Sequence, residues 1–214
     1  MLGPALHIQR HLGSCSMMPL TDVDDVADEV RVALAEGDEI CATVRALDGY
    51  GAEVFGFVAG VLDDVAAARD VYATIGERVR EKLVTFGGPC DLRTWLYAIA
   101  CRALAEHRDR SACAGSVRSP VALPARGTTQ PPRRKSRLDA LALLRSSLPA
   151  RDRELLVLRV DRQLSWDELA TVFLGADASA RDRVREVVRL RSRYRLVKDW
   201  LTREATARGI LGRD

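Results

Sequence analysis

The stretch DLRTWLYAIACRAL, residues 91–104, decides the fold class of this chain of 214 residues. Its apolar side chains recur at steps of three and four, the period of one helix face: Leu92, Trp95, Ile99 and Ala103. Asp91 precedes the first of them, and an aspartate there caps free backbone N–H groups. The pattern predicts a helix over about 92–109 with this face buried.

The same helical period extends towards the N-terminus, with few prolines or β-branched runs. Breaks are expected at Gly37, at Asp63-Asp64 and at the Gly87-Gly88-Pro89 turn. The helices expected before the quoted stretch span about 22–35, 38–62 and 64–84. Residues 21–109 are therefore predicted to form a four-helix domain.

Residues 110–136 are rich in Ala, Gly, Ser, Pro and Arg and have no sustained period, which is typical of a flexible linker. Helical periodicity returns in residues 137–214, with helices expected at about 137–147, 150–160, 165–174 and 180–207. Residues 1–20 are expected to be a disordered tail or a mis-assigned start. The predicted fold is all-α, with two helical domains joined only by the linker.

The second domain has the order of a helix-turn-helix. Ser165 and Glu168 form a Ser-x-x-Glu capping box, which marks a helix start. In the last helix the residues expected to face the core are Val187, Leu190, Tyr194, Val197 and Leu201. Residues 181–203 carry nine basic and three acidic side chains. Two short helices before a long basic one favour insertion of that helix into the DNA major groove.

Charge is divided unevenly along the chain. Residues 1–100 contain 8 Lys+Arg against 16 Asp+Glu, whereas residues 101–214 contain 25 against 14, so the net charge of +3 conceals two opposite halves. The basic half is suited to a polyanion, and the acidic half to a protein partner.

Composition excludes several other classes. With 47% hydrophobic and 29% charged residues the chain is typical of a folded protein. No apolar run approaches the roughly 20 residues of a membrane span, and the five cysteines contain no CxxC pair. The common nucleotide-binding, hydrolase and metalloprotease motifs are absent. We expect a soluble, cytoplasmic, non-enzymatic protein with no catalytic residues, metal site, membrane contact or cofactor.

Two stretches resemble the characteristic regions of extracytoplasmic-function sigma factors, in the same order. They are DVYATIGERVREKLVTFGGPCDLRTWLYAIACRAL (Asp70–Leu104) and SLPARDRELLVLRVDRQLSWDELATVFLG (Ser147–Gly175). The string RTWLYAIA is the most specific part, and Arg189–Leu211 resembles a variant found in myxobacterial members. The resemblance covers about residues 45–205. It implies a promoter-recognition subunit of bacterial RNA polymerase.

For residues 21–109 the resemblance implies sigma region two, which binds the polymerase clamp and opens the minus-ten element. The implied polymerase contacts are Asp63, Asp64, Asp70, Ala73 and Glu77. The implied minus-ten residues are Phe86, Gly87, Asp91, Arg93, Thr94, Tyr97 and Arg102. Aromatic and arginine side chains beside a Gly-rich loop can hold an unpaired base, and Arg93, Tyr97 and Arg102 are expected to lie off the buried face.

For residues 137–214 the resemblance implies sigma region four, which reads the minus-thirty-five element as duplex. The implied readers are Arg185, Arg189, Arg191, Ser192, Arg193, Arg195 and Lys198, and arginine can pair bidentately with guanine. Fourteen residues separate Gly175 from Leu190 where about five are usual, so either the turn is elongated or the recognition helix begins early. Ala73 and Cys101-Arg102 also depart from the family pattern.

The resemblance implies core RNA polymerase (clamp and flap), promoter DNA and an inhibitory anti-sigma factor as partners of a chain that is monomeric when free. An alternative is a helix-turn-helix regulator that binds DNA without directing initiation. The acidic first half and the RTWLYAIA string favour the sigma factor, because a simple regulator needs neither. A further alternative is a redox sensor, since Cys90 lies beside the Gly-rich loop and Cys101 follows in the next helix.

Overall fold

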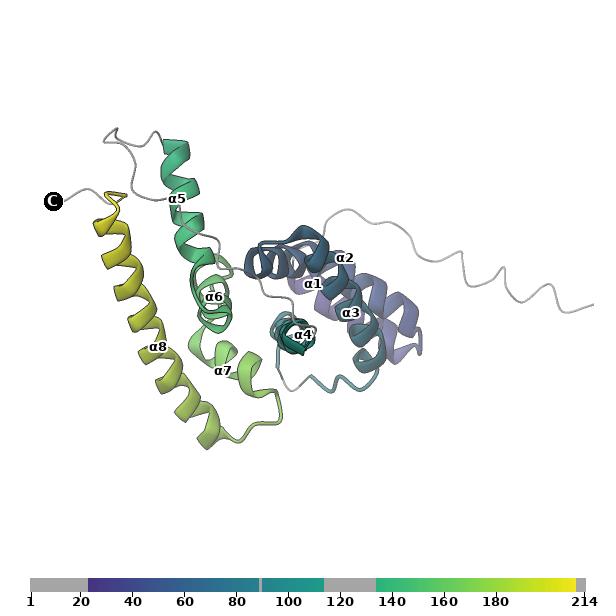
Figure 1. Cartoon of the computed structure of the whole chain (residues 1–214). Helices are drawn as coiled ribbons and strands as arrows, with labels where there is room; N and C mark the ends of the chain where they lie inside the picture. Colours follow the sequence, from purple (N-terminus) through teal and green to yellow (C-terminus); the bar gives the residue numbers. More distant parts are fainter. Residues whose placement is uncertain (1–22, 89, 114–133, 211–214) are drawn as a thin grey trace, which may run out of the picture.

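The computed structural model describes residues 23–88, 90–113 and 134–210, and all regular elements in these ranges are helices (Figure 1). This confirms the all-α prediction for the described residues. The predicted tail 1–20 and residues 114–133 of the predicted linker lie outside them. The elements are α1 (Val23–Ala35), α2 (Glu39–Leu62), α3 (Val65–Leu83), α4 (Leu92–Cys113), α5 (Arg134–Ser146), α6 (Ala150–Leu156), the π-helix η1 (Val157–Asp161), α7 (Trp166–Leu174) and α8 (Ala180–Ala207).

Side-chain caps explain why the helices begin and end at the predicted breaks. Asp38 accepts a hydrogen bond from the Cys41 N–H at the start of α2. Asp63 ends α2 in the left-handed conformation (φ 54°), and Asp64 then caps α3. The predicted capping box at Ser165 and Glu168 is present at the start of α7. The breaks that were expected on sequence grounds are therefore confirmed.

Two predicted bounds need correction. The predicted linker 110–136 is helical at both ends, because α4 continues to Cys113 and α5 begins at Arg134. The helix expected over 150–160 is α only as far as Leu156, and its last turn is the π-helix η1. A π-turn contains an extra residue, which ordinary 3.6-residue periodicity does not reveal.

Helix α4 lies at the centre of the molecule. It packs against α2 and α3 on one side and against α7 on the other (Figure 1). The expectation of a single buried face is therefore incomplete, and the expectation that Tyr97 lies off that face is wrong, because its side chain is 0% exposed. A helix that is apolar on all sides belongs in a protein interior. The buried residues of α4 are Leu92, Thr94, Leu96, Tyr97, Ala98, Ile99, Ala100, Cys101, Ala103 and Leu104.

The first half of the structure, α1 to α4, and the second half, α5 to α8, share one hydrophobic core. Side chains from α6, η1 and α7 join those of α1 to α4 in a single cluster, in which Leu158 and Leu169 are as fully buried as Phe57. The expectation that only the linker joins the halves is therefore wrong for this structure. Removal of this apolar surface from water favours the packed arrangement.

Helix α8 forms the outer edge of the second half and packs on α5, α6 and α7 (Figure 1). The predicted core-facing positions are confirmed: Leu190 and Val197 are buried, and Val187, Tyr194 and Leu201 are half-buried. Among the described residues, no helix combines the length and apolar character needed to cross a membrane.

Candidate nucleic-acid interface

Helices α7 and α8 are consecutive and joined by a short turn, which is the order of elements that a helix-turn-helix requires. The turn comprises residues 175–179, and the Ser179 side chain accepts a hydrogen bond from the Asp182 N–H (3.1 Å) to start α8. Of the two alternatives for the long interval before Leu190, the early start of the last helix is therefore correct. The residues that follow the interhelical turn directly are those from Ala180, at the N-terminus of α8, and Leu190 lies further along the helix.

All seven predicted minus-thirty-five residues are exposed on α8, but they are not equivalent. Arg193 donates to both carboxylate oxygens of the buried Asp152, so it ties α8 to α6. Arg185 and Arg189 form i, i+3 ion pairs within α8. These surface pairs are weak and can exchange for phosphates. Arg193 is thus the member of the set with a structural role. The seven are Arg185, Arg189, Arg191, Ser192, Arg193, Arg195 and Lys198.

The predicted minus-ten residues differ in how accessible they are. Asp91 accepts from the backbone N–H groups of Arg93 and Thr94 (3.1 and 3.4 Å), so its carboxylate caps α4 as predicted. Phe86 is half-buried, with its ring centroid 4.9 Å from that of Trp95. Three members have restricted access: Thr94 and Tyr97 are buried and Arg93 is half-buried. Gly87 and Arg102 are exposed.

Arg93 connects the two halves of the chain. Its Nε donates to both carboxylate oxygens of Glu53 in α2 (3.1 Å each), and its Nη2 donates to the same carboxylate and to the carbonyl of Arg162 (2.9 Å). Bidentate contacts of this kind to a carboxylate are strong and directional. The half-buried guanidinium that was expected to contact single-stranded DNA is therefore bonded to other parts of the protein in this structure.

Two further arginines bridge the halves. Arg153 of α6 donates to the Val61 carbonyl and to the Asp63 carboxylate (3.0 Å). Arg108 of α4 pairs with Glu154 of α6, whose side chain is 0% exposed. With Arg93, which also lies over the Tyr97 ring, these contacts hold the second half against α2 and α4.

The predicted polymerase contacts fall into two groups. Asp70, Ala73 and Glu77 are exposed on one face of α3 and are available to a partner. Asp63 instead pairs with Arg153, and Asp64 accepts from the backbone N–H groups of Ala66 and Ala67. The structure thus brings the first three together and gives the other two positions structural roles at the α2–α3 junction.

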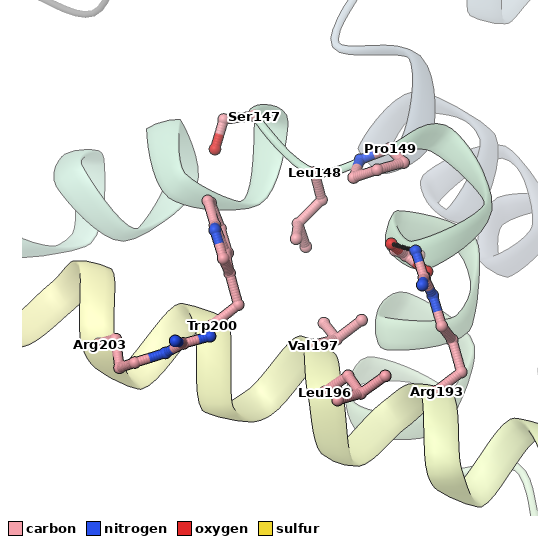
Figure 2. A pocket seen from close by; sticks show the side chains of 9 residues that line it. Ser147, Leu148, Pro149, Arg193, Leu196, Val197, Trp200 and Arg203 are labelled. Carbon is pink, nitrogen blue, oxygen red and sulfur yellow. Dashed lines mark hydrogen bonds and ion pairs between the residues drawn. The ribbon is translucent and has the colours of Figure 1, made fainter.

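A cavity of about 420 Å³ lies between the α5–α6 turn and α8 (Figure 2). Leu148, Val197 and Trp200 form much of its apolar lining. The Arg193–Asp152 ion pair lies at one side of it. No sequence motif predicted this cavity, because it depends on the angle at which α8 crosses the preceding turn.

Two interface glutamates have pKa values shifted in opposite directions. Burial acts to raise the pKa of Glu53, but hydrogen bonding from Arg93 and the nearby positive charges hold it below its usual value. Burial raises the pKa of Glu154 above its usual value, against the opposing charges of Arg108 and Arg151. The same interface therefore lowers the pKa of one carboxyl group and raises the pKa of the other.

We expect Glu53→Gln and Glu154→Gln to change the pH dependence of stability with opposite sign. A lowered folded pKa contributes stability above the unfolded value of about 4.3, and this is lost as pH falls through the folded pKa. A raised folded pKa contributes stability below about 4.3, and this is lost as pH rises through the folded pKa. The free energy of unfolding of the wild type minus that of Glu53→Gln should therefore decrease as the pH falls. The same difference for Glu154→Gln should increase as the pH falls. Urea denaturation at a series of pH values measures both differences. If the free energy of unfolding of the wild type and of both variants changed in parallel with pH, the pKa shifts of Glu53 and Glu154 would be contradicted.

Compared with known proteins, the sequence matches no protein-family model and no curated protein. The functional assignment of the interface therefore depends on the chain's own residues and on the resemblance of its two quoted stretches to sigma factors.

Proposed function

We propose that this chain is an extracytoplasmic-function-type sigma factor that joins core RNA polymerase and directs it to promoters. The observation that carries the proposal is that α8 follows α7 after a short turn and carries exposed arginines along its length. The helix lies at the edge of the molecule (Figure 1). A helix of this kind fits the DNA major groove.

The exposed face of α3 supports the polymerase half of the proposal. Asp70, Ala73 and Glu77 lie at positions i, i+3 and i+7, so they share one side of the helix. This side is not used in packing, and it carries negative charge within the acidic half of the chain. It is suited to a protein partner with a basic surface.

The packing of α6 and α7 on α2 and α4, which we call the closed arrangement, adds a requirement to this function. Tyr97 and Thr94 are buried and Arg93 is bonded to the Arg162 carbonyl, so contact of these residues with a promoter strand requires a rearrangement around α4. The Thr94 hydroxyl oxygen and the Arg162 Nε are buried without hydrogen-bond partners among the described residues. A buried unpaired polar group costs about 1–3 kcal/mol, so these groups lower the free energy needed to separate the halves.

The same closure favours a second candidate function. A DNA-binding regulator needs the outer face of α8 but has no need of an accessible α4. The burial of Tyr97 and Thr94 is therefore also compatible with a helix-turn-helix protein that binds duplex DNA without opening it.

Transcription of fragmented genomic DNA by purified bacterial core polymerase, with and without the full chain, separates these functions. The sigma factor predicts new discrete 5′ ends that share two upstream motifs. A double variant, Asp70→Arg and Glu77→Arg, should abolish these ends yet retain duplex binding, because both side chains are exposed. Ends that are absent despite sequence-specific duplex binding would support the regulator, and the absence of both would contradict both functions.

A further inference from the structure

Two apolar side chains stand exposed on the basic face of α8. Val184 is 65% exposed and Val188 is 60% exposed, one turn apart on the same side of the helix. An isolated exposed valine is common in proteins. An aligned pair at the start of the second helix of a helix-turn-helix lies where base edges are contacted, because the first turns of that helix enter the major groove.

The surroundings of the pair identify what it contacts. Successive residues rotate by about 100° around a helix, so Arg181 and Arg185 flank the valines on one side and Arg191 on the other, with Arg195 continuing their line. All four arginines are exposed. This ring of positive charge is complementary to a polyanion, and it disfavours an apolar protein surface or a second copy of the same basic helix.

A polyanion that also offers apolar groups to these valines is duplex DNA. Within the major groove the apolar group on a base edge is the 5-methyl of thymine, and small apolar side chains contact it. Residues four apart on a helix are about 6 Å apart, which is close to two base-pair steps at about 3.4 Å each. The two valines are therefore spaced to meet two methyl groups within about two steps of each other.

We propose that Val184 and Val188 read thymine methyl groups in the major groove. This inference rests on the proposed DNA-binding function and moves the base-reading part of α8 towards its N-terminus. Arg191, Ser192 and Arg195 then lie further along the helix and contact the flanking sequence or phosphates. The closed packing of α4 leaves this reading intact, because α8 faces away from the first half (Figure 1).

The test begins with selection of duplexes by the full chain from a pool with a randomised centre. Each thymine of a selected duplex is then replaced singly by deoxyuridine, which removes only the methyl group. We expect one or two replacements to weaken binding about fourfold each, the value of burying one methyl-sized group. In the Val184→Ala, Val188→Ala double variant, the thymine and deoxyuridine duplexes should bind equally at those positions.

The control is Val32→Ala, which makes the same truncation at a 58% exposed position of α1 and should keep the full thymine preference. Alanine favours helix more than valine does, so none of these variants threatens folding. If a duplex is selected but deoxyuridine binds as well as thymine, or the preference survives in the double variant, the valines do not read methyl groups while DNA recognition stands. If no duplex is selected, DNA recognition by α8 itself fails.

Discussion

Replacement of Tyr97 by alanine should lower the free energy of unfolding by about 4 kcal/mol, the usual cost of removing a buried aromatic ring. The Tyr97 side chain is completely buried, and its ring meets that of Phe57 edge-on, with centroids 5.4 Å apart. Loss of the ring leaves a cavity between α2 and α4 that rigid helices cannot close. Urea denaturation of the wild type and the variant measures the difference.

Tyr97→Phe is the matched control. The phenol oxygen is buried beside the Glu53 carboxylate, and burial followed by hydrogen bonding to that carboxylate raises the pKa of Tyr97. The phenylalanine keeps the ring and removes only the hydroxyl, so it should lower the free energy of unfolding by no more than about 1 kcal/mol. A Tyr97→Ala variant that keeps wild-type stability would contradict the burial of this side chain.

Replacement of Arg108 by alanine should destabilise the protein by about 3 kcal/mol, because it leaves a fully buried carboxylate without its main partner. Glu154 is 0% exposed, and its remaining cation, Arg151, approaches to only 3.6 Å. Because this pair joins α4 to α6, the variant should weaken the contact between the two halves. Urea denaturation again provides the measurement.

Two comparisons isolate the effect of burial. Arg78 pairs with Glu106, which is 52% exposed, so Arg78→Ala should cost less than about 1 kcal/mol. Adding Glu154→Gln to Arg108→Ala should restore most of the lost stability, since a neutral amide is easier to bury than an anion. Equal losses for the two arginine variants, or no recovery with the glutamine, would mean that Glu154 is solvated.

Local signals in the sequence predicted the helices because each helix carries its own information. Asp64 and Ser165 specify helix starts through their side chains, and the three-and-four spacing of Leu190, Tyr194 and Val197 specifies which side of α8 is buried. These features involve neighbours within a few residues of each other. They are therefore readable without knowing where the rest of the chain lies.

The start of the last helix was predicted correctly at about residue 180, but a local pattern that specifies it was not used. Ser179 and Asp182 form a Ser-x-x-Asp pattern, which is typical of a helix N-terminus. Alignment to the family string at Leu190 instead drew attention to residues 191–195. The capping pattern decides between the two alternatives that the alignment left open.

The closure of the second half over α4 was not readable from local pattern. The stripe that begins at Leu92 predicts one buried face, yet Tyr97 and Cys101 on other sides are buried as well. The Tyr97 ring packs on Phe57 of α2, and Cys101 lies beside Glu154 of α6, so their burial depends on elements that are distant from α4 in sequence. A weak clue existed, since the residues from Leu96 to Leu104 are apolar on nearly all sides, as expected of a central helix.

Alkylation of the native cysteines tests the central claim, that the second half covers α4 in the free chain. Cys101 is buried beside Glu154 of α6, and burial raises the pKa of its thiol, whereas Cys113 at the end of the same helix is exposed. A pulse of iodoacetamide, read by peptide mass spectrometry and normalised to the rates in urea, compares the two. The closed structure predicts rapid modification of Cys113 and strong protection of Cys101. Modification of Cys101 as fast as Cys113 under native conditions would contradict it.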